Sequence, residues 1–158
     1  MTLRGVFHAL PPGVFGSRIR TRADLAAFVT GTHAIGATAQ LALADAGDAL
    51  AALCGRLDLH EALGVQPLTI PGTTDARYLP ARRLPALAER IDAIAPGALA
   101  KAISQCERRP AADEHTAVDK GQLARQFLQL KRFMRDCATH QWEVVFARHG
   151  DRAGTPLG

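Results

Sequence analysis

The chain has 158 residues, of which 47% are hydrophobic, and it carries a formal net charge of +4. This length is typical of one globular domain with a buried core, and the apolar fraction excludes a disordered chain. No apolar run approaches the roughly 18 residues that a membrane-spanning helix needs, and the N-terminus lacks the long apolar core of a signal peptide. We therefore expect a cytoplasmic protein without a membrane segment.

The N-terminal third predicts one strand and two helices. Residues 2–10 alternate and end at two prolines, which is typical of a β-strand. Residues 21–31 have the apolar spacing of a short helix, with Thr21 or Arg22 before its start and Gly31 at its end. After a loop, the alanine-rich segment 38–55 predicts a second, longer helix.

The middle of the chain predicts short helices joined by loops. Prolines interrupt residues 65–79, which favours a loop with at most a short strand. In the next helical pattern Pro85 fits only the first turn, and Pro96-Gly97 ends the helix. The helical segments expected here are 57–64, 82–97 and 98–109, followed by a linker at 110–115.

The strongest pattern lies near the C-terminus, where a helix over 119–140 leads into a strand over 142–149. On a helical wheel the apolar residues fall within an arc of about 100°, which predicts one buried face and one solvated face. The strand has apolar side chains on both faces, as inner strands do. The residues of the buried helical face are Leu123, Phe127, Leu130, Met134, Cys137 and Ala138.

These elements predict an α+β fold. Residues 1–150 are expected to form a compact single domain, in which N-terminal and C-terminal strands make a small mixed sheet packed against several helices. Residues 151–158 have no hydrophobic pattern, and we expect a flexible C-terminal tail there.

Four segments, in order along the chain, carry a resemblance to the YfbM-like family of small bacterial proteins of unknown function. One helix entry of that family resembles YLPARRLPALAERIDAI (78–94), and its late helix and strand are similar to FLQLKRFMRDCATHQWEVVF (127–146). Its opening strand looks like RGVFHALPPG (4–13), and a further segment looks like LDLHEAL (57–63). The resemblance implies a compact α+β fold and suits a partner-binding or toxin-immunity role. It supplies no catalytic residue.

Motifs of several enzyme classes are missing from the sequence. The segment GTHAIGATA (31–39) has neither the glycine spacing of a dinucleotide site nor the lysine of a phosphate loop, and no Gly-x-Ser-x-Gly turn exists. The acidic segment 113–119, which holds His115, is interpreted more simply as a helix N-terminus than as a metal site. We therefore assign no catalytic residue, no metal site and no cofactor.

The cysteines fit a structural role. Cys54, Cys106 and Cys137 are three in number, and no two of them form a Cys-x-x-Cys pair. Cys137 would need a nearby base to act as a nucleophile, and its helical position faces the predicted core. Small buried hydrophobic residues in a reducing compartment are the simpler interpretation.

The positive charge lies in the second half of the chain. Residues 1–79 carry six basic and six acidic side chains, whereas residues 80–158 carry 13 basic and nine acidic ones. Such a surface suits an acidic protein, whereas nucleic-acid binding proteins usually show denser basic clusters. The basic residues expected to bind the partner are Arg125, Lys131, Arg132 and Arg135.

A second candidate site lies within residues 57–78. His60 and Glu61 have the chemistry of an acid–base pair, although adjacent helical residues point about 100° apart. Arg77 and Tyr78 offer a cationic, aromatic spot for a carboxylate or phosphate. The simpler interpretation of that spot is a tyrosine packed on the sheet beside solvated arginines.

The sequence thus predicts a non-enzymatic, cytoplasmic, protein-binding domain of bacterial type, with an immunity protein that neutralises a toxin as the concrete form. The alternative is a small enzyme or ligand-binding protein that uses residues 57–78. A nucleic-acid binder is disfavoured, because the aromatic residues near the basic helix have better places in the core than on the surface.

Overall fold

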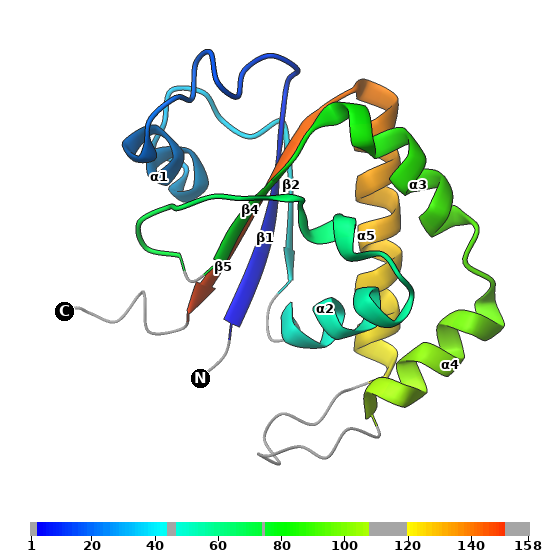
Figure 1. Cartoon of the computed structure of the whole chain (residues 1–158). Helices are drawn as coiled ribbons and strands as arrows, with labels where there is room; N and C mark the ends of the chain where they lie inside the picture. The colour runs from blue at the N-terminus through cyan, green and yellow to red at the C-terminus, as the bar shows by residue number, and fades with distance from the viewer. Residues whose placement is uncertain (1–2, 44–46, 74, 108–119, 151–158) are drawn as a thin grey trace.

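The structure is a computed structural model, and it describes residues 3–43, 47–73, 75–107 and 120–150. Its centre is a five-stranded sheet in the order β2-β1-β5-β4-β3, with helices on both sides (Figure 1). The strands are β1 (Leu3–Leu10), β2 (Ala39–Leu43), β3 (Gln66–Pro67), β4 (Asp75–Leu79) and β5 (Glu143–Gly150). The helices are α1 (Arg22–Thr30), α2 (Gly47–Arg56), α3 (Leu84–Asp92), α4 (Pro96–Glu107) and α5 (Lys120–His140), with short 3₁₀ helices η1 (His60–Leu63) and η2 (Ala81–Arg83).

The predicted α+β class is confirmed. The sheet does join strands from the two ends of the chain, but all four pairings are antiparallel, where a mixture of directions was expected. Parallel neighbours need a crossover that returns the chain to the starting end of the sheet. No pair of neighbouring strands in the described sheet is joined in that way.

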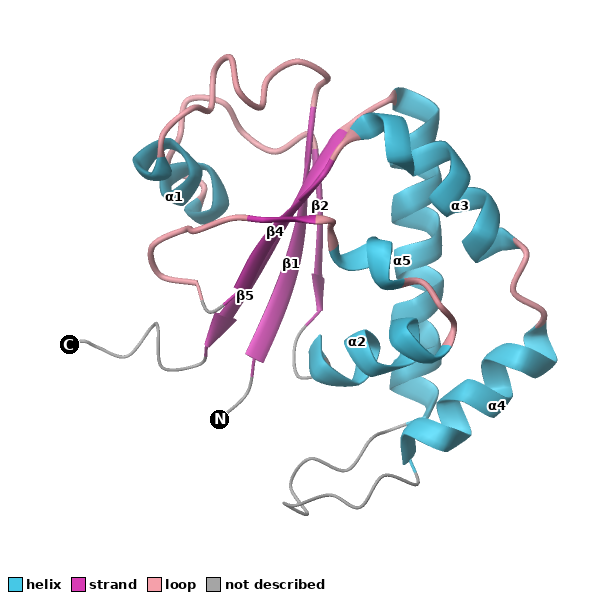
Figure 2. Cartoon of the chain, viewed as in Figure 1, coloured by secondary structure: helices cyan, strands magenta, loops and turns pink. Residues whose placement is uncertain are grey.

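Strand β5 is an inner strand, as its two apolar faces predict, because it lies between β1 and β4. Its side chains alternate between two hydrophobic clusters. Val144 and Phe146 contact the cluster that α2, α3, α4 and α5 complete, whereas Val145 and Ala147 contact the cluster that α1 completes. We call these sides of the sheet the α5 face and the α1 face, and Figure 2 shows the unequal cover, with α1 alone on its side.

Helix α5 covers much of the α5 face, and the predicted helix over 119–140 is confirmed within one residue at its start. The predicted arc of apolar residues is buried, apart from the partly buried Ala138. Phe133 and the polar Gln126 of α5 are also buried. The charged residues of α5 are therefore left on its outer side and on the side toward α3.

Helix α1 begins and ends with strong local signals. The Thr21 hydroxyl accepts a hydrogen bond from the Asp24 backbone N–H, and the Asp24 carboxylate accepts one from the Thr21 N–H, which is a capping box. Backbone N–H groups of Arg20 and Thr21 hold the pKa of Asp24 below its ordinary value. Gly31 ends the helix in the left-handed conformation with φ of 83°.

The helix predicted over residues 38–55 is wrong in its first half. Residues 39–43 form β2, which pairs with β1 from Ala39 to Leu43, and α2 begins only at Gly47. Alanine and leucine favour a helix locally, but pairing with β1 satisfies a row of backbone groups that would otherwise be an open sheet edge. Tertiary pairing therefore overrides the local propensity.

Two further boundaries differ from the prediction. The segment expected to be a loop over 65–79 contains β3 and β4, which pair with each other. Pro96 begins α4 and does not end α3, whose last residue is Asp92. Proline suits a first helical position because no intrahelical bond needs its missing N–H. The tail predicted at 151–158 and the linker at 110–115 lie outside the described residues.

In the described ranges no helix is both long and apolar enough to cross a membrane.

Substitution of Gly64, the residue after η1, tests how tightly this turn is packed against β4. Gly64 has φ of 101°, and a Cβ there would lie 3.1 Å from the Arg77 carbonyl carbon and closer still to the Arg77 Cβ. We expect Gly64→Ala to lower the free energy of unfolding by about 2–4 kcal/mol, because strain and crowding add. The measurement is urea denaturation followed by circular dichroism.

Gly72 provides the matched control, because its φ is 86° and no atom lies within 4 Å of its Cβ position. Gly72→Ala should cost only the left-handed backbone term, about 1 kcal/mol. Equal costs for the two substitutions would contradict the packing of β4 against Gly64.

Candidate functional site

The basic residues predicted on α5 divide into two groups. Lys131 and Arg135 point toward α3, where both reach the Asp92 carboxylate, at 3.9 Å and 2.9 Å from its Oδ1. Their charge therefore serves at least partly to hold α3 against α5. Arg125 and Arg132 are exposed on the outer side of α5, and neither makes an ion pair within the described residues.

A leucine lies between these two outer arginines on the helix surface. Leu128 is 49% exposed, the only large hydrophobic side chain in the described part of the chain that is so exposed. It is three residues after Arg125 and four before Arg132, so the three side chains form one stripe along α5. We call Arg125, Leu128 and Arg132 the outer stripe.

Glu61 of the second candidate site is engaged in a local ion-pair network. Its carboxylate binds Arg83 and Arg90, with 2.7 Å between Oε1 and the Arg90 Nη1. Arg90 also donates to the Asp58 backbone carbonyl. The Arg83 hydrogen bond is the largest cause that lowers the pKa of Glu61, ahead of Arg90. Glu61 therefore ties η1 to η2 and α3, which is a structural use of the carboxylate.

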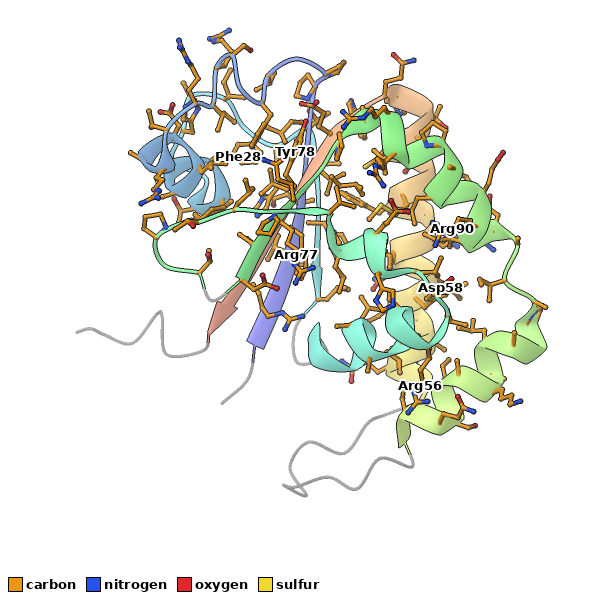
Figure 3. All side chains as sticks on the ribbon, viewed as in Figure 1. Phe28, Arg56, Asp58, Arg77, Tyr78 and Arg90 are labelled. Atoms are coloured by element: carbon orange, nitrogen blue, oxygen red, sulfur yellow. The ribbon has the colours of Figure 1, made fainter. Side chains whose placement is uncertain are left out.

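The other three residues of that candidate site do not converge on Glu61. His60 is exposed, and its ring lies near Gly55 of α2. Arg77 and Tyr78 are neighbours on β4, so their side chains leave opposite faces of the sheet. Arg77 packs over Gly64 on the α5 face and lies 3.5 Å from Asp75, whereas Tyr78 packs on the α1 face (Figure 3).

Tyr78 belongs instead to a group of polar side chains on the α1 face. Its hydroxyl donates to Glu143 Oε2 at 2.6 Å. Burial, followed by the Glu143 carboxylate, raises the pKa of the Tyr78 hydroxyl above its ordinary value, so the hydroxyl remains a donor. On the neighbouring strands His8, which is 1% exposed, lies 3.1 Å from the Gln40 amide nitrogen and packs against Phe28.

The register of the sheet explains this grouping. His8 pairs with Gln40 on one side and Val145 on the other, and Val145 pairs with Tyr78. The four residues therefore form one row across four strands, and Glu143 lies two residues along β5 on the same face. His8, Gln40 and Glu143 were not among the site residues predicted from the sequence. The pattern that could have indicated them is the alternation along each strand. Each of these polar residues stands between two apolar residues whose side chains leave the opposite face of the sheet.

The cysteines are structural in this fold. Cys54, Cys106 and Cys137 are all buried free thiols. Burial raises the pKa of Cys54 and of Cys137 to about 12, with nearby Cys106 adding to the effect at Cys54 and Asp136 to that at Cys137. A thiol with such a pKa holds almost no thiolate near neutral pH, so it is a poor nucleophile.

Across the described residues no three histidine, cysteine or acidic side chains gather as a metal site would require. The acidic segment 113–119, interpreted as a helix N-terminus, lies outside those residues.

Removal of the Glu61 charge should destabilise the protein slightly. Its pKa is lowered in the folded state, so its contribution is complete above the unfolded value near 4.5 and is lost as the pH falls through the folded value. Because the partner arginines are half exposed, we expect Glu61→Gln to cost no more than about 1 kcal/mol at pH 7. Thermal unfolding at pH 7 and at successively lower pH measures the difference, and a cost that does not diminish as the pH falls below about 4.5 would contradict the ion-pair role.

The thiols should be inert in the folded protein. We expect none of Cys54, Cys106 and Cys137 to react rapidly with Ellman's reagent at pH 8, and all three to react at once in urea. The absorbance of the released thiolate counts the reactive thiols in each state. A thiol that reacts within seconds in the native protein would contradict the structural role and indicate an accessible nucleophile.

Comparison with known proteins places the fold and leaves the activity open. No protein-family model and no curated protein matches the chain. Among solved structures the chain is similar to YfbM from Escherichia coli, a protein of unknown function, with a TM-score of 0.61 over 92% of this chain and 99% of that one at 14% sequence identity. At such identity the likeness concerns the fold alone. The resemblance that the sequence suggested is thereby confirmed: this chain has the fold of YfbM.

Proposed function

We propose that the chain is a non-enzymatic protein-binding domain, and that its partner binds the outer stripe of α5. The observation that carries this proposal is the exposed Leu128 between two arginines, Arg125 and Arg132, that have no ion pair within the described residues. Arginine is enriched in protein interfaces relative to the rest of the surface and is frequent among the residues that contribute most to binding.

The chemistry of the stripe indicates what the partner offers. Burial of the exposed half of a leucine side chain contributes about 1 kcal/mol, and each arginine offers a planar fork of donors to a carboxylate. An apolar recess bordered by carboxylates fits both features. Net charge of +4 favours association with an acidic surface and makes the association rate depend on salt.

An immunity protein that neutralises an acidic toxin in the cytoplasm is the concrete form of this proposal. Such a protein needs a stable core and a charged surface, and it needs no catalytic group. The described part of the chain supplies a well-packed core and an unpaired basic stripe.

The alternative, a ligand site built from residues 57–78, receives less support. Glu61 is occupied by two arginines, and Arg77 and Tyr78 lie on opposite faces of the sheet. A site at Tyr78 would therefore have to use residues of the α1 face, which sequence proximity did not indicate.

Alanine variants of the outer stripe test the proposal. The tagged chain is used to retain partners from its native host, and the retained protein is then purified for binding kinetics. We expect Arg125→Ala/Arg132→Ala to weaken binding at least about tenfold, mainly through slower association, and to reduce its salt dependence. Leu128→Ala should weaken binding mainly through faster dissociation. Co-expression with a toxic partner should restore growth with the unmodified chain and less well with the variants.

The control is Arg18→Ala/Arg22→Ala, which removes the same charge from exposed positions near α1. Its binding should fall only through the weaker long-range attraction. A partner that binds the stripe variants and the control variant equally well would show that the contact surface lies elsewhere.

A further inference from the structure

The α1 face has a feature that protein binding through α5 does not use. Glu143, at the first position of β5, pairs with Leu10, the last residue of β1. The loop over residues 11–20 leaves the sheet at this point and returns over Tyr78, where Phe15 stacks on the tyrosine ring. Glu143, Tyr78 and Phe15 therefore lie together at one end of the sheet.

Glu143 has an unused acceptor at this place. Its Oε2 accepts the Tyr78 hydrogen bond, whereas its Oε1 is buried and accepts no hydrogen bond from the described residues. Within that part of the chain no cation makes an ion pair with this carboxylate, and the exposed Arg82 acts on Tyr78 only through its charge. A buried acceptor without a donor is costly, so a ligand that brings an N–H donor would gain more here than at the surface.

Phe15 occupies the position that a flat ligand would take. Its ring centroid lies 4.1 Å from that of Tyr78, with 15° between the ring planes, which is a stacked arrangement. Phe15 is only partly buried, and it is packed at the margin of the α1 cluster. There is therefore room for a second planar ring on the side of Tyr78 that Phe15 covers.

The loop that carries Phe15 is attached to the fold mainly by side chains, since Ile19 is 1% exposed in the cluster of the α1 face and Val14 and Phe15 pack beside it. The backbone hydrogen bonds of residues 13–19 join residues of the loop to one another, as in the bonds from Arg18 and Ile19 to the Val14 carbonyl. Gly13 and Gly16 flank Phe15 with φ of 85° and 90°, and no atom lies within 4 Å of either Cβ position. Ile19 therefore holds one end of the loop in the core, and displacement by a ligand concerns Phe15, whose side chain is only partly buried.

We propose that Tyr78 and Glu143 form a binding site for a planar aromatic ligand that carries an amidine or amino donor, and that Phe15 covers this site until the ligand replaces it. The ring of the ligand stacks on Tyr78, and its N–H group donates to Glu143 Oε1. His8 on β1 and Gln40 on β2 lie farther along the same row of the sheet and bond to each other. Binding here is independent of the outer stripe of α5, which lies on the other side of the sheet.

Benzamidine is a suitable probe because it is a flat ring with a cationic amidine. Titration of the protein by calorimetry and by two-dimensional NMR measures its affinity and its location. We expect Glu143→Gln to weaken binding at least about tenfold, since it removes a buried charged acceptor and keeps the shape of the side chain. Phe15→Ala should strengthen binding several-fold, because the ligand no longer competes with the ring of the loop.

Glu61→Gln is the matched control, because that carboxylate is held by two arginines elsewhere, and it should leave the affinity unchanged. Circular dichroism confirms that each variant is folded, and the comparison of Glu143→Gln with Glu61→Gln tests the site even if Phe15→Ala unfolds. Binding by Phe15→Ala alone would still support a covered site. Absence of binding to the folded Phe15→Ala protein at millimolar benzamidine, or equal binding by the Glu143→Gln and Glu61→Gln variants, would overturn the proposal.

Discussion

The rest of the structure depends on the position of β5 between β1 and β4. Its apolar side chains alternate between the two faces, so the strand can be buried only if both faces are covered. Phe146 shows how closely this is achieved, because its ring lies 4.6 Å from that of Phe7 and fills the space that a Cβ on Gly5 would need. The four helices on the α5 face and α1 on the other face follow from this requirement, and so does the separation of the two candidate surfaces.

The packing of α5 determines which of its charges face outward. Burial of one arc fixes the rotation of the helix, and α3 then lies beside Lys131 and Arg135. Asp92 compensates part of the charge of that pair, whereas Arg125 and Arg132 remain with Leu128 on the outer side. The basic surface thus has fewer free charges than a count along the helix suggests. It also contains the exposed Leu128, which a count of charges does not reveal.

The two faces of the sheet are covered unequally, and the proposed ligand site lies on the face with less cover. The α5 face is covered by four helices and includes the three cysteines and the Glu61 ion pairs. The α1 face is covered by a nine-residue helix and by a loop that places the partly buried Phe15 on the Tyr78 ring. A ligand can therefore compete with Phe15 on the α1 face, whereas comparable access on the α5 face would require separation of packed helices.

The sequence by itself determined the elements whose signals are local. The capping box and Gly31 define α1, the apolar arc defines α5, and apolar residues on both faces mark β5 as an inner strand. The resemblance to the YfbM-like family was also visible in the sequence, in the segments 4–13, 57–63, 78–94 and 127–146. Tertiary structure alone decided that residues 39–43 form an edge strand, because pairing with β1 outweighs the helical propensity of alanine and leucine. It also decided that Glu143, Tyr78 and His8 share one face, since the register between strands brings together residues that are far apart along the chain and is not encoded in any one segment.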